Sequence, residues 1–173
     1  MLNYSEDRAM VTYPGAMSKL SISDISDEAL LSAKHLHVSS VFLQPGLKPD
    51  LVQLFQKAKE LGLTTSMDPQ WDPAETWDIP LSALLPYVDI FMPNVAELKA
   101  LTNTNDLEAA IRSISIYGNV VIIKDGNKGA YLCDGDTVVH QPAFLNTTVV
   151  DSIGAGDSFD AGFIHRFVQG EPI

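Results

Sequence analysis

The sequence predicts an α/β fold, a three-layer αβα arrangement around a mostly parallel sheet, from two observations. From residue 35 onward, short β-rich segments alternate with helical segments. This alternation is typical of parallel strands joined by crossover helices. Residues 129–143 then break the alternation with two β-rich runs around Asp134-Gly135, which predicts a late β-hairpin. The length of 173 residues fits one domain or a large part of one.

The first unit of the sheet is expected between residues 35 and 68. Residues 35–43 combine β-branched and aromatic residues and stop at Pro45-Gly46, which predicts a strand and a turn. Residues 49–61 predict an amphipathic helix that ends before Gly62, because apolar residues recur there at helical spacing. Residues 63–68 predict a second strand, ending at Asp68-Pro69.

Two more strands and two more helices follow in the central part of the chain. Residues 88–92 predict a strand, and Asn94 after it can cap a helix that carries Leu98 and Leu101. Asp106 opens the next helix, which is expected to end near Gly118.

The last elements are a strand, the hairpin and a final helix. Residues 119–124 are nearly all apolar, as expected of a strand covered on both faces. The final helix is expected to begin near Gly156 and to run through Phe159, Phe163 and Phe167.

Composition excludes several functional classes. The net charge of −11 opposes binding to phosphate backbones and anionic lipid surfaces, so we expect no nucleic-acid and no membrane partner. The single cysteine, Cys133, excludes an internal disulfide framework and a Cys-based zinc cluster. No apolar run approaches the length of a membrane span, and the first ten residues are polar. We therefore expect a cytoplasmic protein, with a homodimer left open.

Polar residues gather where the predicted strands end, and each group has two interpretations. Asn94 and Glu97 could organise Mg²⁺ through water, but Asn at a cap with Glu three residues later is also a capping box, which we favour. Lys124, Gly126 and Gly129 could approach a phosphate, or could simply form a tight turn. Ligands of parallel sheets bind beyond the carboxyl ends of the strands, so the coincidence of these groups favours a site there.

Residues 150–163, VDSIGAGDSFDAGF, carry the most information. Gly154, Ala155 and Gly156 are small and directly precede a helical pattern, so their backbone N–H groups could bind an anion. Asp157 beside an anion site could accept a proton from an attacking hydroxyl. The alternative is an ordinary helix start with an acidic residue in its first turn.

Together these motifs resemble the ribokinase-like (PfkB) family of carbohydrate and nucleoside kinases. VDSIGAGDSFDAGF is similar to the family's C-terminal signature, NVAE at residues 94–97 to its N-x-x-E motif, and KDGNKG at residues 124–129 to its K-x-G-x-x-G strand end. The order and spacing also match. The resemblance covers essentially the whole chain and implies that residues 1–173 are the C-terminal part of a single kinase domain.

The resemblance implies a role for each matching residue. Asp157 would be the general base, and Gly154, Ala155 and Gly156 would form the anion hole for the γ-phosphoryl group. The remaining assignments are Asn94 and Glu97 for Mg²⁺ and phosphates, Lys124, Gly126 and Gly129 for ATP, Asp151 for a monovalent cation such as K⁺, and Asp68 for the substrate.

The sequence also departs from the family. Where many sugar-acid and fructose kinases have D-P-N-x-R, this chain has Asp68-Pro69-Gln70-Trp71-Asp72, which places Asp72 at the arginine position. That change weakens the case for a carboxylate-bearing substrate. The family's first strands, glycine pair and lid have no counterpart in the 173 residues, nor does the segment that closes over adenine.

The resemblance therefore implies an ATP-dependent sugar kinase that transfers the γ-phosphoryl group to a hydroxyl of a small carbohydrate. The 173 residues alone are expected to be inactive. The alternatives are a nucleoside kinase of the same family and a nucleotide-binding regulatory module without turnover. Asp157 argues against the module, because a pure binder gains nothing from a carboxylate beside phosphate.

Overall fold

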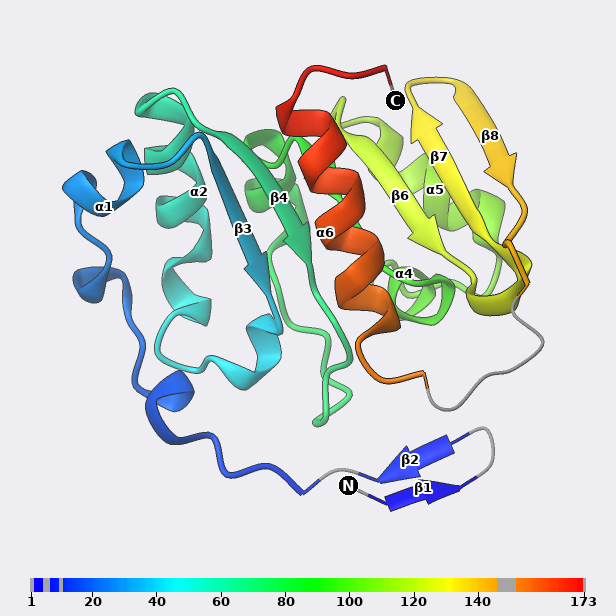
Figure 1. Cartoon of the computed structure of the whole chain (residues 1–173), viewed down its shortest axis with the longest axis horizontal. Coiled ribbons are helices and arrows are strands. Elements are labelled where there is room, and N and C mark those ends of the chain that lie inside the picture. The colour runs from blue at the N-terminus through cyan, green and yellow to red at the C-terminus, as the bar shows by residue number, and fades with distance from the viewer. Residues whose placement is uncertain (1, 5–6, 10, 146–151, 173) are drawn as a thin grey trace.

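The computed structural model describes residues 2–4, 7–9, 11–145 and 152–172, and its centre is a six-stranded sheet (Figure 1). The order in the sheet is β3-β4-β5-β6-β7-β8, which follows the order in the chain. The strands are β3 (His35–Ser39), β4 (Thr64–Asp68), β5 (Ile90–Phe91), β6 (Val120–Lys124), β7 (Ala130–Asp134) and β8 (Thr137–Gln141). The pairs from β3 to β6 are parallel, and β7 and β8 pair antiparallel. The predicted mostly parallel sheet with a late hairpin is confirmed.

Six helices accompany the sheet in the described part of the chain. They are α1 (Asp27–Leu31), α2 (Leu51–Glu60), α3 (Leu81–Leu84), α4 (Val95–Leu101), α5 (Leu107–Ser115) and α6 (Ala155–Val168). Helices α2 to α5 connect the parallel strands. Short 3₁₀ turns lie at Gly15–Ser18, Ile22–Asp24, Val41–Leu43, Lys48–Asp50, Leu85–Tyr87 and Gly126–Lys128. At the N-terminus, β1 (Leu2–Tyr4) and β2 (Asp7–Ala9) form a separate antiparallel pair. None of the helices in the described ranges is long and apolar enough to span a bilayer.

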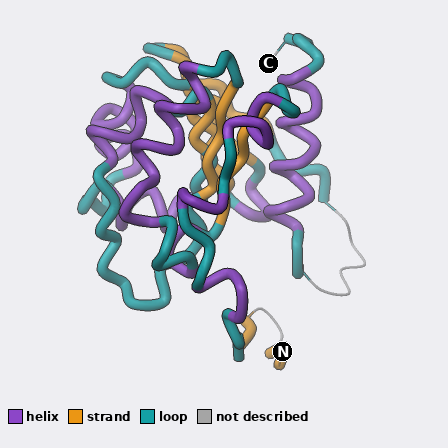
Figure 2. Tube along the Cα trace, turned by 90° about the vertical axis from the view of Figure 1, so that its left-hand side faces the viewer, coloured by secondary structure: helices purple, strands orange, loops and turns teal. Residues whose placement is uncertain are grey.

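The sheet separates two helical layers, as the edge-on view in Figure 2 shows. Helices α1 to α5 contribute to the larger core on one face, where α2 alone buries Leu51, Leu54, Phe55 and Ala58. On the other face α6 packs over Ile90, Met92 and Ile122 through Phe163, Ile164 and Phe167. The amphipathic stripe predicted for residues 49–61 therefore faces the larger core, and the three-layer prediction is confirmed.

The first strand is shorter than the sequence predicts. Residues 35–39 are extended, but Ser40 has a left-handed backbone with φ 55° and Val41–Leu43 form a 3₁₀ turn. The strand prediction for residues 40–43 is wrong, because Val41, although β-branched, is buried in the core rather than paired in the sheet. Apolar composition by itself does not distinguish these two ways of being buried.

The hairpin turn lies one residue later than predicted. Asp134 pairs with Thr137, so the two loop residues are Gly135 and Asp136 rather than Asp134 and Gly135. Gly135 has φ 56°, which a two-residue hairpin turn requires at its first position and glycine adopts without strain. Cys133 on β7 is buried in the core.

Candidate active site

Asp68 and Lys124 are the last residues of two parallel strands, β4 and β6, and their side chains point to the same face of the sheet as α6. Alternation along the strands explains this direction: Met67 and Ile123, their neighbours, lie in the larger core on the opposite face. Asn94 follows β5, which lies between β4 and β6, and makes an isolated bridge with Lys124. Three groups predicted from separate motifs thus meet at one edge of the sheet.

A buried ion cluster forms at this edge. The Lys124 Nζ donates to Asp68 Oδ2 at 2.7 Å and to both oxygens of Asp160 at 3.1 and 3.2 Å. Asp68 and Asp160 are only 2% and 3% exposed. Burial opposes the charge of Lys124, but the two carboxylates outweigh it and raise the pKa of the ammonium. Lys124 therefore stays charged and held between two carboxylates.

Asp160 was not among the residues that the sequence singled out. It lies on α6, one turn after Asp157. Burial and its hydrogen bond with Asp68 raise its pKa to about 7, although Lys124 acts in the opposite direction. The signal in the sequence was its i+3 spacing from Asp157, which places both carboxylates near one side of a helix.

Asn94 and Glu97 form the predicted capping box at the start of α4. The Asn94 Oδ1 accepts from the Glu97 N–H at 2.9 Å, and Glu97 Oε2 accepts from the Asn94 N–H at 2.8 Å. Glu97 is 5% exposed, and burial raises its pKa to about 7, with the charge of Asp68 adding to the rise. The capping interpretation is confirmed, and it leaves the Glu97 Oε1 outside the box.

The start of α6 places Asp157 in the first turn of the helix. Gly154 is the N-cap with φ 71°, and its carbonyl accepts the first helical hydrogen bond, from the Ser158 N–H at 2.8 Å. The N–H groups ahead of that bond lack helical acceptors, as at any helix start; that of Ala155 donates to the Ser152 carbonyl at 3.3 Å. A Cβ on Gly156 would lie 3.9 Å from the Lys124 Nζ, so the start of α6 adjoins the ion cluster.

Asp157 contacts a residue that the sequence did not identify as functional. The Gln70 Nε2, from the loop after β4, donates to Asp157 Oδ1 at 3.0 Å. The structure thus brings Asp157, Asp68, Asn94, Glu97 and Lys124 to one edge of the sheet. Asp151, predicted to bind a monovalent cation, lies outside the described residues.

Gly126 begins a short 3₁₀ turn after β6, and Gly129 directly follows it. Gly129 has φ 109°, and a Cβ there would lie 2.0 Å from the Gln141 carbonyl oxygen, so only glycine fits against the end of β8. This close approach explains why residue 129 is a glycine, and it supports the tight-turn interpretation. Both glycines also line a cavity of about 580 Å³, whose wall is mostly apolar and includes Tyr131, Phe144 and Phe159.

Asp72, the residue at the arginine position of related motifs, organises its own loop. Its carboxylate accepts from the N–H groups of Ala74, Thr76 and Trp77 at 2.8–2.9 Å. Burial alone would raise the pKa of Asp72, but these hydrogen bonds together lower it. Asp72 therefore holds the shape of the loop that follows Gln70 and Trp71. It supplies no positive charge at the position where related motifs have arginine.

One family of known proteins matches the whole chain. The sequence profile of pfkB family carbohydrate kinases covers residues 1–173. The chain belongs to the pfkB carbohydrate kinase family. The fold agrees with this membership, because ribokinase and fructokinase structures share it.

Relatives of this pfkB chain act on different acceptors according to their names. A protein from Archaeoglobus fulgidus called an uncharacterized sugar kinase is 29% identical over 167 residues, which are 96% of this chain and 66% of that protein. A cytidine kinase from Thermococcus kodakarensis is 28% identical over 151 residues, covering 84% of this chain and 52% of the kinase.

Solved structures of pfkB-type kinases superpose on the chain. Arabidopsis thaliana ribokinase in complex with ribose and ATP has a TM-score of 0.71 at 27% identity, covering 86% of this chain and 48% of the ribokinase. A double-mutant fructokinase from Vibrio cholerae, bound to fructose, ADP and a potassium ion, has a TM-score of 0.69 at 25% identity, covering 86% and 49%. The chain thus spans about half the length of these structures.

Proposed function

We propose that the protein is an ATP-dependent kinase that transfers the γ-phosphoryl group to a hydroxyl of a small carbohydrate. Family membership supports the class of reaction. The observation that carries the proposal is the position of Asp157, in the first turn of α6 and next to the edge where β4, β5 and β6 end. Segments outside the 173 residues would complete the acceptor site, so we propose that the chain alone turns over little substrate.

In this proposal Asp157 accepts the proton of the acceptor hydroxyl as its oxygen bonds to the γ-phosphorus. The bond between that phosphorus and the β,γ-bridging oxygen breaks, and ADP leaves with the electron pair. The backbone at Gly154, Ala155 and Gly156 would stabilise charge on the transferred group, because N–H groups at a helix start favour anions. Asp68, on the neighbouring strand end, would face the acceptor.

The nucleotide is proposed to lie between Lys124 and the mostly apolar cavity beside β7 and α6. Gly126 and Gly129 line that cavity, and Phe159 and Phe163 supply aromatic surface on which a purine can stack. Lys124 is already paired with two carboxylates, so its charge is largely balanced. We therefore assign Lys124 to orienting Asp68 and Asp160 as much as to contacting phosphate.

Mg²⁺ fits the chemistry of Asn94 and Glu97 through water rather than directly. Both side chains already cap α4, and one carboxylate oxygen of Glu97 lies outside that pair of hydrogen bonds. Mg²⁺ in kinases keeps several waters and uses few protein ligands, so one carboxylate beside the phosphates is sufficient. When bound, the ion would neutralise charge on the β- and γ-phosphates. The potassium ion of the fructokinase supports a monovalent cation at Asp151.

Asp157→Asn in the full-length protein tests this proposal. The change keeps size and reach but removes the proton acceptor, so phosphoryl transfer is expected to fall by about 10²–10⁴. ATP affinity is expected to stay the same or to rise slightly, because a negative charge beside the polyphosphate is lost. A coupled assay and calorimetry on the same proteins measure both quantities.

Asp136→Asn is the matched control, since it removes the same charge from the exposed hairpin turn. A loss of no more than about threefold in Asp157→Asn, far short of the general-base range, would show that Asp157 is only a helix-start residue. A protein that binds ATP but phosphorylates no sugar or nucleoside would support the regulatory module instead. A panel that includes cytidine and adenosine distinguishes the nucleoside kinase, which the cytidine kinase relative makes the main enzymatic alternative.

A further inference from the structure

We propose that Gln70 is a positioning residue that orients the Asp157 carboxylate, and that Ser40 anchors the other end of the Gln70 amide. This inference rests on the proposed function, because it concerns the group assigned there as the base. The three residues come from three separate elements: the segment after β3, the loop after β4 and the start of α6.

The hydrogen bonds define which way the Gln70 amide points. Its Nε2 donates to Asp157 Oδ1 at 3.0 Å, and its Oε1 accepts from the Ser40 hydroxyl. An ionised carboxylate can only accept, so the amide nitrogen must face Asp157. The amide oxygen then faces Ser40, whose hydroxyl must be the donor. A reversed amide would turn its oxygen toward the carboxylate and lose the hydrogen bond to Asp157, whereas the Ser40 hydroxyl could still accept from the amide nitrogen.

Ser40 and Gln70 both have a backbone conformation that non-glycine residues rarely adopt. Ser40 and Gln70 each have φ 55°, in the left-handed region. Three other non-glycine residues share that region, but only Ser40 and Gln70 are joined to each other by a hydrogen bond among the described residues. The Gln70 N–H also donates to Asp68 Oδ1 at 3.2 Å, which ties the loop to the ion cluster. Strain of this kind persists where surrounding contacts over-determine the local structure.

The arrangement leaves one oxygen of Asp157 for chemistry. Gln70 occupies Oδ1, and within the described ranges Oδ2 has no hydrogen-bond partner. A carboxylate held at one oxygen cannot rotate freely, so its second oxygen presents a fixed lone pair to an acceptor hydroxyl. Asp157 is itself exposed and lies in the first turn of a helix, where no packing restricts its side chain. The hydrogen bond from Gln70 therefore restricts the rotation of the Asp157 carboxylate, which burial does not restrict.

Gln70→Leu in the full-length protein removes the donor while keeping a side chain of similar size. We expect kcat to fall by about three- to tenfold, the loss typical of one hydrogen bond at an accessible site, with the KM for ATP unchanged. Ser40→Ala should give a smaller fall in the same direction, because the Gln70 amide still donates to Asp157 but loses the second hydrogen bond that holds it in place. Glu75→Gln is the control: Glu75 lies in the same loop, has φ 53° and is exposed.

A double-variant cycle separates positioning from a general effect on folding. In an Asp157→Asn background, Gln70→Leu should cause no further loss of kcat, because the carboxylate it orients is gone. Additive losses would overturn the inference. Wild-type kcat in Gln70→Leu, together with a large loss in Asp157→Asn, would overturn it while leaving the proposed function intact. Asp157→Asn with full activity would instead overturn the proposed function.

A second measurement does not depend on turnover. The side-chain amide of Gln70 gives its own signals in a ¹H–¹⁵N spectrum of the protein. Asp157→Ala should shift these signals and speed their exchange with water, since the acceptor is lost. Asp136→Ala should leave them unchanged. Signals that stay the same in Asp157→Ala would overturn the contact, whatever the kinetics show.

Discussion

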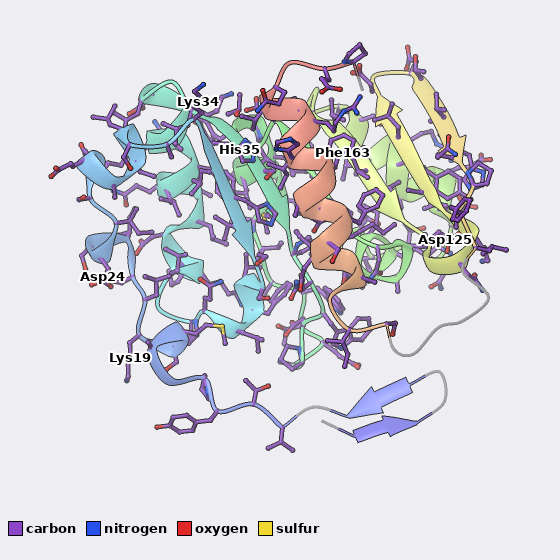
Figure 3. The ribbon with its side chains drawn as sticks, in the orientation of Figure 1. Lys19, Asp24, Lys34, His35, Asp125 and Phe163 are labelled. Atoms are coloured by element: carbon purple, nitrogen blue, oxygen red, sulfur yellow. The ribbon has the colours of Figure 1, made fainter. Side chains whose placement is uncertain are left out.

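The two faces of the sheet differ in what covers them and in what they carry. On the face covered by α1 to α5, side chains such as Val38, Met67, Phe91 and Ile123 form a continuous apolar core. On the face covered by α6, the β5 and β6 half is apolar and contacts Phe163, whereas the β3 and β4 half is polar. Figure 3 shows His35 on the β3 side of α6 and Phe163 on the β6 side. The second face thus changes character from one side of α6 to the other.

The polar half is organised by a chain of hydrogen bonds between β3 and β4. The Thr64 hydroxyl donates to the Lys34 carbonyl, so it accepts from His35 Nδ1 at 2.8 Å. His35 Nε2 then accepts from the Ser66 hydroxyl at 2.7 Å, and Ser66 accepts from His37 Nδ1 at 2.7 Å. Three of the four ring nitrogens are used within the protein. Both rings are therefore held by side chains of β4.

The comparison of the two faces explains where this chain carries the charged side chains of its candidate site. The first face excludes water, so its strands carry mainly apolar side chains at alternate positions. The second face has only one helix over it among the described elements, and its strand ends carry Asp68 and Lys124 while α6 supplies Asp157 and Asp160. Charged groups gather on the face where hydrogen-bond partners and solvent are both within reach.

The largest expected effect in stability comes from matched phenylalanines on the two faces. Phe55 is fully buried on α2, whereas Phe163 on α6 is only partly buried. Phe55→Ala should lower the free energy of unfolding by about 3–5 kcal/mol, the range for a fully buried Phe, and Phe163→Ala by about 1 kcal/mol, as for partial burial. Urea denaturation followed by circular dichroism measures both. Equal losses would show that the two faces are equally well packed.

The next effect compares two lysine–carboxylate pairs. Lys124→Met would leave Asp68 and Asp160 together without a cation, and should cost about 3 kcal/mol of unfolding free energy, the low end for a broken buried pair. The low end applies because the carboxyl of Asp160, with its pKa raised to about 7, can take a proton. Lys59 pairs with Asp89 at 2.6 Å, but both side chains are about one-third exposed. Lys59→Met should cost about 1 kcal/mol or less, as for a solvent-accessible pair.

The most gradual effect is a dependence of stability on pH from His35. Burial lowers the pKa of His35 to about 4, with the charge of His37 adding to the fall. The unfolded chain binds this proton below its ordinary pKa of about 6.5, so stability conferred by the neutral ring is complete above that pH and is lost as pH falls toward 4. The slope cannot exceed about 1.4 kcal/mol per pH unit for one proton.

His35→Gln isolates this contribution from other titrating groups. The stability of the wild-type protein relative to this variant should fall between pH 6.5 and pH 4 and stay constant above, in the window set by the ordinary and lowered pKa of His35. His140→Gln, in the exposed β8 strand, is the control. A pH-independent difference between the wild-type protein and His35→Gln would mean that the ring titrates normally in the folded state.

Much of the fold was predictable because its signals are local. Helical spacing from Leu51 to Ala58 indicated both the helix and the face it buries, and Asn94 with Glu97 indicated the capping box. The nearly all-apolar run at residues 119–124 indicated a strand covered on both sides, and the structure has this strand at Val120–Lys124. These features depend on neighbours within four residues, so the sequence determines them directly. The same holds for glycine at the N-cap of α6, where the backbone is left-handed.

The contacts that complete the candidate site were decided by the tertiary structure. Gln70 and Asp157 are 87 residues apart, and Lys124 is 36 residues from Asp160. Nothing near Gln70 in the sequence indicates which carboxylate it meets, and Asp160 taken alone is an ordinary helical acid. Only the parallel order of β4, β5 and β6 brings these strand ends to one edge, with α6 lying across them. Residue types set what each group can do, and the packing of distant segments decides which groups act together.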